Sequence, residues 1–197
     1  MINRIKIGIL GGSFDPVHKA HIELAKAVYE QCELDLLLFV PARQAALKDN
    51  EVCATAQDRL NMLEIATKNL SINYQIDTFE LDKDEVSYSI DTAKYLYNKY
   101  PNAKLVWIIG SDHIGKLDKW KDVDQLCNIV EFACAKRDGY PLQADTIPLS
   151  AKIEYVKFEP ILVSSTEIRK HLKNGKNLET MLESKVISYK KDKKLYK

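Results

Sequence analysis

Two histidines lie three residues apart, directly after a glycine-rich turn. His18 and His21 follow Gly11-Gly12-Ser13, and this turn follows an apolar run over residues 5–10. Side chains at this spacing share one face of a helix, and imidazole N–H groups can donate to phosphate oxygens. Glycines allow close approach to the backbone, and a helix N-terminus attracts anions. The pattern therefore predicts a phosphate-binding site.

The turn differs from the two commonest glycine fingerprints for nucleotides. The G-x-G-x-x-G spacing of dinucleotide-binding folds is missing, and no Gly-Lys-Ser/Thr follows, as a P-loop requires. A plain loop ahead of a helix is the alternative interpretation. The histidine pair directly after a strand favours the functional one.

A second candidate anion site opens another expected helix, at Val163-Ser164-Ser165-Thr166-Glu167-Ile168-Arg169. Ser164 and Glu167 have the spacing of a capping box, which predicts a helix start. Ser165 and Thr166 offer hydroxyls and backbone N–H groups, and Arg169 lies one turn further on. An ordinary capped helix has the same residues. A triphosphate, however, needs donors from several segments, so we expect this helix start to join the first.

Strand-like apolar runs alternate with segments of helical periodicity. Strands are expected at residues 5–10, 34–40, 72–79, 105–109, 129–135 and 153–158, the last at an edge. Helices are expected at residues 22–29, 55–66, 89–100, within 112–126 and at 164–172, with Thr55 and Ser89 as caps. This alternation predicts an α/β fold with a doubly wound, mostly parallel sheet and helices on both faces.

The candidate residues follow the expected strands. In a doubly wound sheet, ligands bind beyond the carboxyl ends of the strands, at the switch point. Residues 11–13, 41–48, 110–112 and 137 follow four different strands. The topology should therefore bring them to one edge of the sheet.

Length and composition favour one globular domain of 197 residues, with a small helical part from about residue 164. The net charge of +1 gives no electrostatic reason to expect nucleic acid. The four cysteines form no C-x-x-C pair, so a reducing cytoplasm is expected. The N-terminus resembles no signal peptide, and no apolar run approaches the roughly 18 residues that span a membrane.

The segment Gly11–His21 resembles the signature of the nucleotidyltransferases that share a His-x-x-His or Thr-x-x-His pair, which include adenylyltransferases of coenzyme biosynthesis. Residues 163–169 are similar to the Ile-Ser-Ser-Thr-x-x-Arg motif of the same superfamily. One departure is Ala20, where the family usually has glycine. We expect its methyl group to be tolerated and to narrow the room for phosphate slightly.

A finer resemblance, to the nicotinate-nucleotide adenylyltransferases, covers nearly the whole chain. Further family-like patterns lie at residues 58–63, 87–92, 107–112 with Trp120, and 136–140. The loop at 41–48 departs from the common Pro-x-x-x-Pro-Pro-His-Lys and retains only the first proline and Lys48. Order and spacing match together, which is more specific than any single motif.

The resemblance implies a Rossmann-like nucleotidyltransferase that transfers an adenylyl group from ATP to nicotinic acid mononucleotide, releasing pyrophosphate, in NAD biosynthesis. It implies catalytic roles on phosphate for His18, His21, Lys48 and Arg169. It assigns ATP binding to Gly11, Gly12, Ser13, Phe14, Gly110, Asp112, Arg137, Ser165 and Thr166. It assigns the mononucleotide to Ser89, Thr92 and Trp120. Mg²⁺ would be held mainly by ATP phosphates, without protein ligands.

Two alternatives stay open. The acceptor could instead be nicotinamide mononucleotide or a pantetheine phosphate. From a different class, the chain could be a nucleotide-binding protein that has lost turnover, for which the altered 41–48 loop is the only hint. The sequence leaves the oligomeric state open, a homo-oligomer included.

Overall fold

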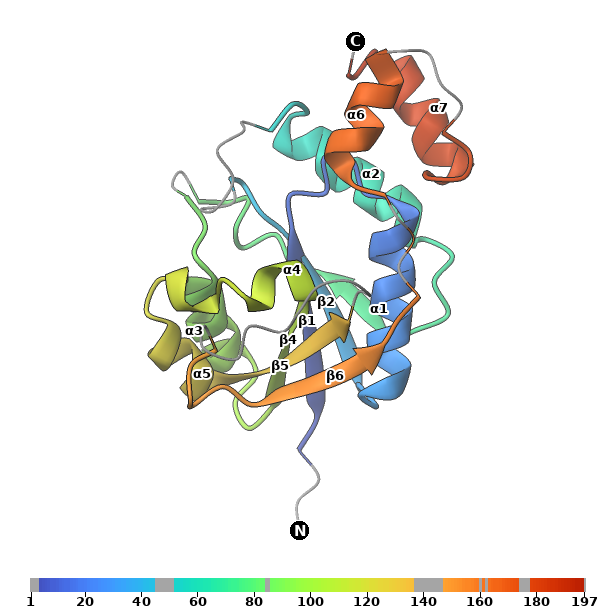
Figure 1. Cartoon of the computed structure of the whole chain (residues 1–197). Coiled ribbons are helices and arrows are strands. Elements are labelled where there is room, and N and C mark those ends of the chain that lie inside the picture. Colours follow the sequence, from blue (N-terminus) through green and yellow to red (C-terminus); the bar gives the residue numbers. More distant parts are fainter. Residues whose placement is uncertain are drawn as a thin grey trace.

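Six parallel strands form the central sheet of the computed structural model, which describes residues 4–44, 52–83, 86–136, 147–159, 161, 163–173 and 178–196 (Figure 1). In sheet order the strands are β3 (Tyr74–Ile76), β2 (Leu36–Pro41), β1 (Lys6–Gly12), β4 (Lys104–Gly110), β5 (Val130–Lys136) and β6 (Ile153–Lys157). All five neighbouring pairs are parallel. The predicted doubly wound α/β sheet is confirmed, and β6 is an edge strand as expected.

Helices cover both faces of the sheet (Figure 1). One face carries α1 (Lys19–Gln31), α2 (Ala56–Thr67) and α7 (Ser184–Asp192). The other carries α3 (Ser89–Lys99), α4 (Ser111–Ile114), the 3-10 turn η1 (Leu117–Lys119) and α5 (Val123–Ile129).

The side-chain alternation of the strands supplies both cores. In β4, Leu105 and Trp107 pack with α3 and α5, while Val106 and Ile108 face the opposite helices. A strand buried on both faces must be apolar throughout, which is why these strands read as continuous apolar runs. The same pattern made them recognisable in the sequence.

Two expected boundaries are wrong. The third strand spans Tyr74–Ile76 instead of 72–79, because it is an edge strand that pairs only with residues 37–39 of β2. Asp77 then turns the chain, and its carboxylate accepts from Phe79 N–H at 3.0 Å. Ser89 is the first residue of α3 and not its cap. Tyr88 occupies the N-cap position and makes no side-chain cap.

The C-terminal helical part packs over the start of α1. It contains α6 (Ser165–Lys173) and α7, which lie beyond the end of β1 (Figure 1). Val163, Ile168, Leu178 and Leu182 form its small core, together with Ala20 of α1. The Ala20 methyl group therefore packs into this core, and its expected effect on the room for phosphate stays a prediction.

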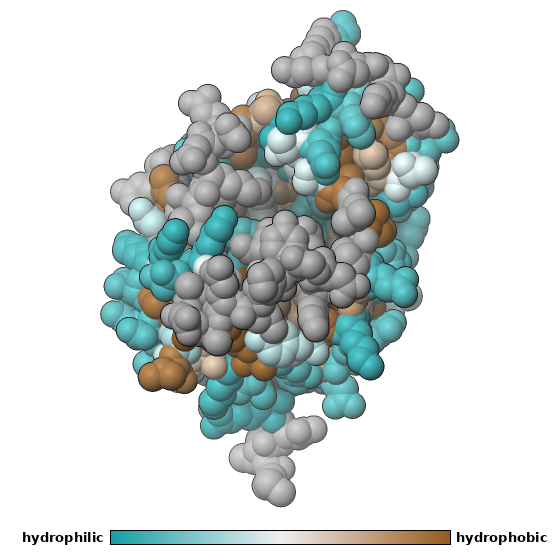
Figure 2. Space-filling view, in the orientation of Figure 1, coloured by the Kyte–Doolittle hydropathy of each residue, from teal (hydrophilic) through white to brown (hydrophobic). Residues whose placement is uncertain are grey.

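The molecular surface is mainly hydrophilic on the face drawn in Figure 2, where hydrophobic residues lie in small separate groups. The hydrophobic side chains with most exposure, such as Tyr97, Leu149 and Tyr155, come from different parts of the chain. None of the described helices is long and apolar enough to cross a membrane.

Candidate functional site

The two middle strands of the sheet stop pairing before they end. β1 and β4 pair only as far as Ile9 and Trp107, three residues before the strands end at Gly12 and Gly110. On one side of this point β2 and β3 follow β1, and on the other side β5 and β6 follow β4. The point between β1 and β4 is therefore the switch point of the sheet. The predicted glycines thus lie at the position where a doubly wound sheet binds its ligand.

Gly11 has room for a side chain within the protein itself. The nearest described heavy atom that a Cβ would meet is Trp107 Cζ2, at 3.7 Å, which is ordinary contact. At Gly12 a Cβ would lie only 3.3 Å from the Phe14 ring. Packing therefore explains the glycine at 12. At Gly11 packing gives no reason for a glycine, and its predicted contact with ATP stays a prediction.

The two histidines form one unit at the N-terminus of α1. Their rings stack with centroids 3.6 Å apart, and the His18 backbone N–H donates to His21 Nδ1 at 3.2 Å. His21 thus occupies the N3 position, where a capping box usually has a glutamate or glutamine. Because Nδ1 accepts, the ring proton of neutral His21 must be on Nε2. His21 is fixed as an Nε2–H donor.

The second predicted anion site reaches the same loop. Ser164 and Glu167 make the expected capping box, since Glu167 N–H donates to Ser164 Oγ and Ser164 N–H donates to Glu167 Oε2. Ser165 Oγ donates to the Pro16 carbonyl at 2.9 Å. Arg169 Nη1 donates to the Asp15 carbonyl at 2.6 Å. The structure therefore brings the histidine loop and the start of α6 together.

These contacts refine the roles predicted for α6. The Ser165 hydroxyl donates its proton to the Pro16 carbonyl, so this side chain anchors the loop. Arg169 also donates to Thr166 Oγ1 at 3.3 Å, and Thr166 is exposed. A guanidinium has five N–H donors in a fixed fork, so it can hold the loop and a phosphate oxygen together. The predicted ATP contacts of Ser165, Thr166 and Arg169 stay predictions.

A buried arginine, which was not predicted from the sequence, supports the loop that precedes the histidines. The Arg59 side chain of α2 is 0% exposed and donates to the carbonyl oxygens of Ser13 and Ala42, both at 2.6 Å, and of Arg43 at 3.1 Å. Burial lowers the pKa of Arg59, and the charge of Asp15 opposes that shift. Arg59 thus ties the loop after β1 to the loop after β2.

A buried carboxylate, also missed, lies within the loop. Asp15 is 2% exposed and accepts from the backbone N–H groups of Cys53 and Ala54, at 2.7 and 3.1 Å. It also accepts from the Tyr196 hydroxyl at 2.7 Å and lies 3.8 Å from Arg169. Asp15 and Arg59 fell within family-like segments, but nothing local in the sequence indicates that either is buried.

Two segments predicted to bind the mononucleotide come together. Lys121 Nζ lies 4.3 Å from the centre of the Tyr88 ring, which places the start of α3 beside the segment after η1. Trp120 meets Trp107 and Phe132 edge-to-face, with ring centroids 6.3 and 6.5 Å apart. Ser89 and Trp120 therefore lie on neighbouring segments, as their predicted shared role requires.

Thr92 differs from this pair, because its hydroxyl points into the protein. It is 1% exposed and donates to Glu80 Oε1 at 2.6 Å. Burial raises the pKa of Glu80, and the hydrogen bond from Thr92 partly offsets that rise. The Thr92 hydroxyl is thus used to hold Glu80, which weakens its predicted role toward the mononucleotide.

Some predicted site residues cannot be placed. Lys48 and Arg137 lie outside the described residues, as does the side chain of Asp112. The backbone of Asp112 belongs to α4, whose N-cap is Gly110. Their predicted roles stay predictions.

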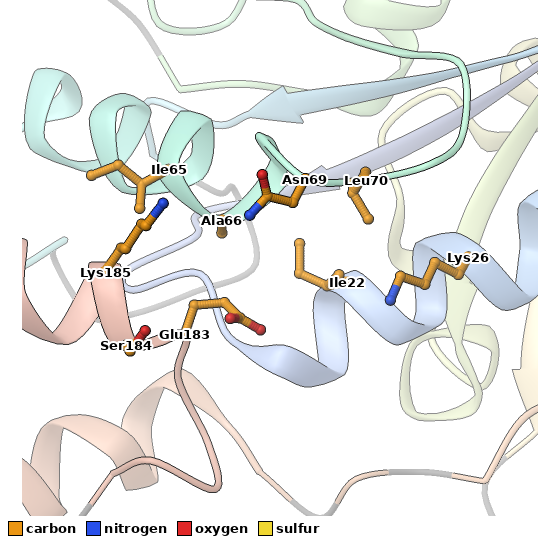
Figure 3. A pocket seen from close by; sticks show the side chains of 9 residues that line it. All are labelled: Ile22, Lys26, Ile65, Ala66, Asn69, Leu70, Glu183, Ser184 and Lys185. Carbon is orange, nitrogen blue, oxygen red and sulfur yellow. The ribbon is translucent and has the colours of Figure 1, made fainter.

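A pocket of about 210 Å³ lies elsewhere, between α1, α2 and the start of α7 (Figure 3). It is lined by Ile22, Lys26, Ile65, Ala66, Asn69, Leu70, Glu183, Ser184 and Lys185. None of the predicted site residues is among them. This pocket is separate from the loop that carries the histidines.

The 3-2-1-4-5-6 sheet, with the His-x-x-His pair at its first strand-to-helix turn, agrees with the nucleotidyltransferase class that the sequence resembles. The chain belongs to the cytidylyltransferase-like family, whose model matches residues 9–171. It is 37% identical over 193 residues to a probable nicotinate-nucleotide adenylyltransferase of Opitutus terrae, covering 98% of each chain. It is 35% identical over 191 residues to the nicotinate-nucleotide adenylyltransferase of Bacillus subtilis, covering 97% of this chain and 98% of the other. Within the family, the chain therefore belongs with the nicotinate-nucleotide adenylyltransferases.

Solved structures have the same fold. The Plasmodium falciparum nicotinic acid mononucleotide adenylyltransferase complexed with NaAD superimposes with a TM-score of 0.83, at 22% identity, covering 98% of each chain. The same enzyme complexed with APC gives a TM-score of 0.80 at 22% identity, with the same coverage. At this identity the likeness concerns the fold, and it confirms the Rossmann-like architecture.

Proposed function

We propose that this chain transfers the adenylyl group of ATP to nicotinic acid mononucleotide, giving nicotinic acid adenine dinucleotide and pyrophosphate in NAD biosynthesis, in the cytoplasm. The observation that carries the proposal is the fixed His18–His21 pair. It lies beside the start of α6, where β1 and β4 have stopped pairing. The names of the relatives support the choice of reaction.

The reaction is a direct displacement at phosphorus. A phosphate oxygen of the mononucleotide forms a bond to the α-phosphorus of ATP, and the bond from that phosphorus to the bridging oxygen breaks, so pyrophosphate leaves with the electron pair. The attacking phosphate is largely dianionic at neutral pH, because its second pKa is about 6. A general base is therefore unnecessary. The protein contributes positioning and stabilisation of charge on the reacting phosphates.

The His21 Nε2–H group is suited to that stabilisation. Its direction is fixed by the bond from the His18 amide to Nδ1 and by the edge-to-face contact with Phe14, whose ring centroid lies 5.0 Å away. A donor held in place before reaction needs no reorganisation when charge develops. His18, stacked on His21, would donate beside it. Arg169, with Lys48 and Arg137, would hold the polyphosphate.

Mg²⁺ would enter with ATP, mainly on phosphate oxygens and water, and would neutralise part of the phosphate charge. Asp15 is the carboxylate of the loop, and the protein contacts described above already occupy it. Among the described residues, no group of three or more His, Cys, Asp or Glu side chains could hold a metal ion.

A preference for the nicotinate over the nicotinamide form would come from hydrogen-bond donors. A carboxylate only accepts, whereas an amide also has an NH₂ group that needs acceptors. The N-cap Tyr88 provides no side-chain cap, so the first N–H groups of α3, beside Ser89, could serve the carboxylate. Trp120 on the neighbouring segment could stack on the pyridine ring. An unsatisfied buried group costs about 1–3 kcal/mol, and the loss of the charge-assisted hydrogen bonds to the carboxylate adds to this cost. Because about 1.4 kcal/mol corresponds to a factor of ten, we expect at least tenfold discrimination in kcat/KM.

Product analysis with three acceptors tests the proposal. The purified chain is incubated with ATP, Mg²⁺ and either nicotinic acid mononucleotide, nicotinamide mononucleotide or phosphopantetheine. We expect equimolar pyrophosphate and dinucleotide, with highest kcat/KM for the first acceptor. Preference for another acceptor would contradict the substrate but leave adenylyl transfer standing. Tight ATP binding without turnover on any acceptor would favour the non-catalytic alternative.

A further inference from the structure

The histidine loop is held by side chains from the C-terminal part of the chain. Ser165 and Arg169 of α6 donate to the carbonyl oxygens of Pro16 and Asp15, two consecutive residues of the loop. His18 follows two residues after Pro16. A displacement of the loop backbone here would therefore move the first histidine of the pair.

A third C-terminal contact reaches the loop from near the end of the described chain. The Tyr196 hydroxyl donates to Asp15 Oδ1 at 2.7 Å, and Asp15 is 2% exposed. Tyr196 and Leu195 pack against the core cluster that contains Phe14 and Val17 of the same loop. Burial, followed by the nearby Asp15 charge, raises the pKa of Tyr196. The phenol therefore stays protonated and can donate.

The Asp15 carboxylate joins four segments at one buried point. It lies in the loop itself and binds the backbone N–H groups of residues 53 and 54 ahead of α2, the α6 guanidinium and the Tyr196 hydroxyl. A buried carboxylate that loses one donor must find another or move, because an unsatisfied buried charge is costly. The position of the loop thus depends on the full set of donors.

We propose that Tyr196 is a positioning residue for the phosphate-binding loop, acting through Asp15 on the geometry of the histidine pair; this inference rests on the proposed function. It gives the C-terminus a part in the reaction in addition to its packing role. Tyr196 is not expected to touch either substrate.

The chain offers a matched control in Tyr189. Tyr189 also belongs to the C-terminal part and donates its hydroxyl to a carboxylate, Asp58 Oδ1, at 2.9 Å. Its hydroxyl oxygen accepts from Asn61 at 2.7 Å. Its partners lie on α2 and not in the histidine loop. Tyr189→Phe therefore removes the same chemical group from the same region, at a contact between α7 and α2 that does not include the histidine loop.

The test compares Tyr196→Phe with Tyr189→Phe in kcat, both KM values, Tm and amide hydrogen exchange. For Tyr196→Phe we expect kcat to fall about tenfold, KM for the mononucleotide to stay within about twofold, and exchange to increase at residues 13–18 and 53–54. For Tyr189→Phe we expect a smaller fall in Tm, because Asp58 is less buried than Asp15, with unchanged kcat and no faster exchange in the loop. Equal kcat and equal loop exchange in the two variants would overturn the proposal.

A double-mutant cycle distinguishes action through Asp15 from a general loss of structure in Tyr196→Phe. In a double-mutant cycle, Asp15→Asn and Tyr196→Phe should be coupled, so the double variant loses less kcat than the product of the single losses. Independent effects would contradict action through Asp15. A wild-type chain inactive with every mononucleotide would contradict the proposed function, while hydrogen exchange in the two variants would still decide whether Tyr196 holds the loop.

Discussion

Replacement of Arg59 by methionine should destabilise the fold through the loops that carry the site. The guanidinium is fully buried and holds three carbonyl oxygens, two of them at 2.6 Å. Hydrogen bonds to a charged group contribute roughly 1.5–3 kcal/mol each. Methionine keeps much of the apolar length and avoids the desolvation of a cation, which costs several kcal/mol. We therefore expect a net loss of about 2–5 kcal/mol in the free energy of unfolding.

Urea unfolding of wild type, Arg59→Met and Arg59→Lys measures this loss at a constant m value. Lysine should be intermediate, because an ammonium keeps the charge but cannot span carbonyls of two loops as a planar fork does. The activity of Arg59→Met should also fall, since Ser13 is one of the three residues held. An Arg59→Met variant within about 0.5 kcal/mol of wild type, the range of an ordinary surface change, would refute the inference that this contact supports the site.

Three further changes test separate parts of the site. Arg169→Lys should raise KM for ATP roughly tenfold by removing one charge-assisted hydrogen bond, and unchanged ATP kinetics would leave Arg169 only its contact with the loop. Gly11→Ala should fold as wild type, because the new Cβ meets nothing described within 3.7 Å, yet weaken ATP binding in calorimetry; normal binding would place the ligand elsewhere. Glu80→Gln keeps the acceptor for Thr92 and removes a carboxyl whose folded pKa is raised by burial. Wild type should therefore lose stability relative to this variant as pH rises from the ordinary Glu value near 4.5 through the raised pKa; a constant difference in unfolding free energy between acid and neutral pH would contradict this.

The fold was predictable because its signals are local. Apolar runs such as Leu34–Val40 mark buried parallel strands, and the Ser164–Glu167 spacing marks the start of α6. The parallel order of the strands then follows from the alternation of strands and helices. The short β3 was not predictable in this way, because its length depends on pairing with β2 alone.

The support of the site was not predictable, because it depends on contacts between distant residues. Tyr196 and Asp15 are separated by 181 positions, and Arg59 and Ser13 by 46. A sequence pattern contains no distance between such residues. The lysine-rich end of the sequence favours a solvated tail, and Lys191, Lys193 and Lys194 are exposed. Tyr189 and Tyr196, whose hydroxyls bind Asp58 and Asp15, lie among these lysines, and the sequence pattern does not distinguish them.

The direction in which a side chain points from its helix was also not predictable from the sequence. Thr92 lies one turn into α3, where the sequence allowed either face, and the structure turns its hydroxyl toward Glu80. Ala20 similarly faces the C-terminal core. In both cases the helix was predicted, but its rotation relative to the rest of the protein was not.

The catalytic role of His21 can be separated from its capping role with two variants. Asparagine has its side-chain oxygen at the same number of bonds from Cβ as Nδ1, so His21→Asn retains an acceptor for the His18 amide but loses the Nε2–H donor. Glutamine has its nitrogen at the same number of bonds as Nε2, so His21→Gln retains that donor and loses the acceptor. The cap is worth about 0.5–2 kcal/mol in stability.

The deciding measurement is kcat for pyrophosphate release with saturating ATP and nicotinic acid mononucleotide in these two variants, with Tm recorded for each. We expect His21→Asn to keep a higher Tm than His21→Gln, since both lose the ring contacts but only asparagine keeps the acceptor, and to lose about 10²-fold or more in kcat, the effect of removing one preorganised donor. We expect His21→Gln to be less stable and to retain much more activity. Wild-type turnover in His21→Asn would contradict the claim that this histidine stabilises the transferred phosphate.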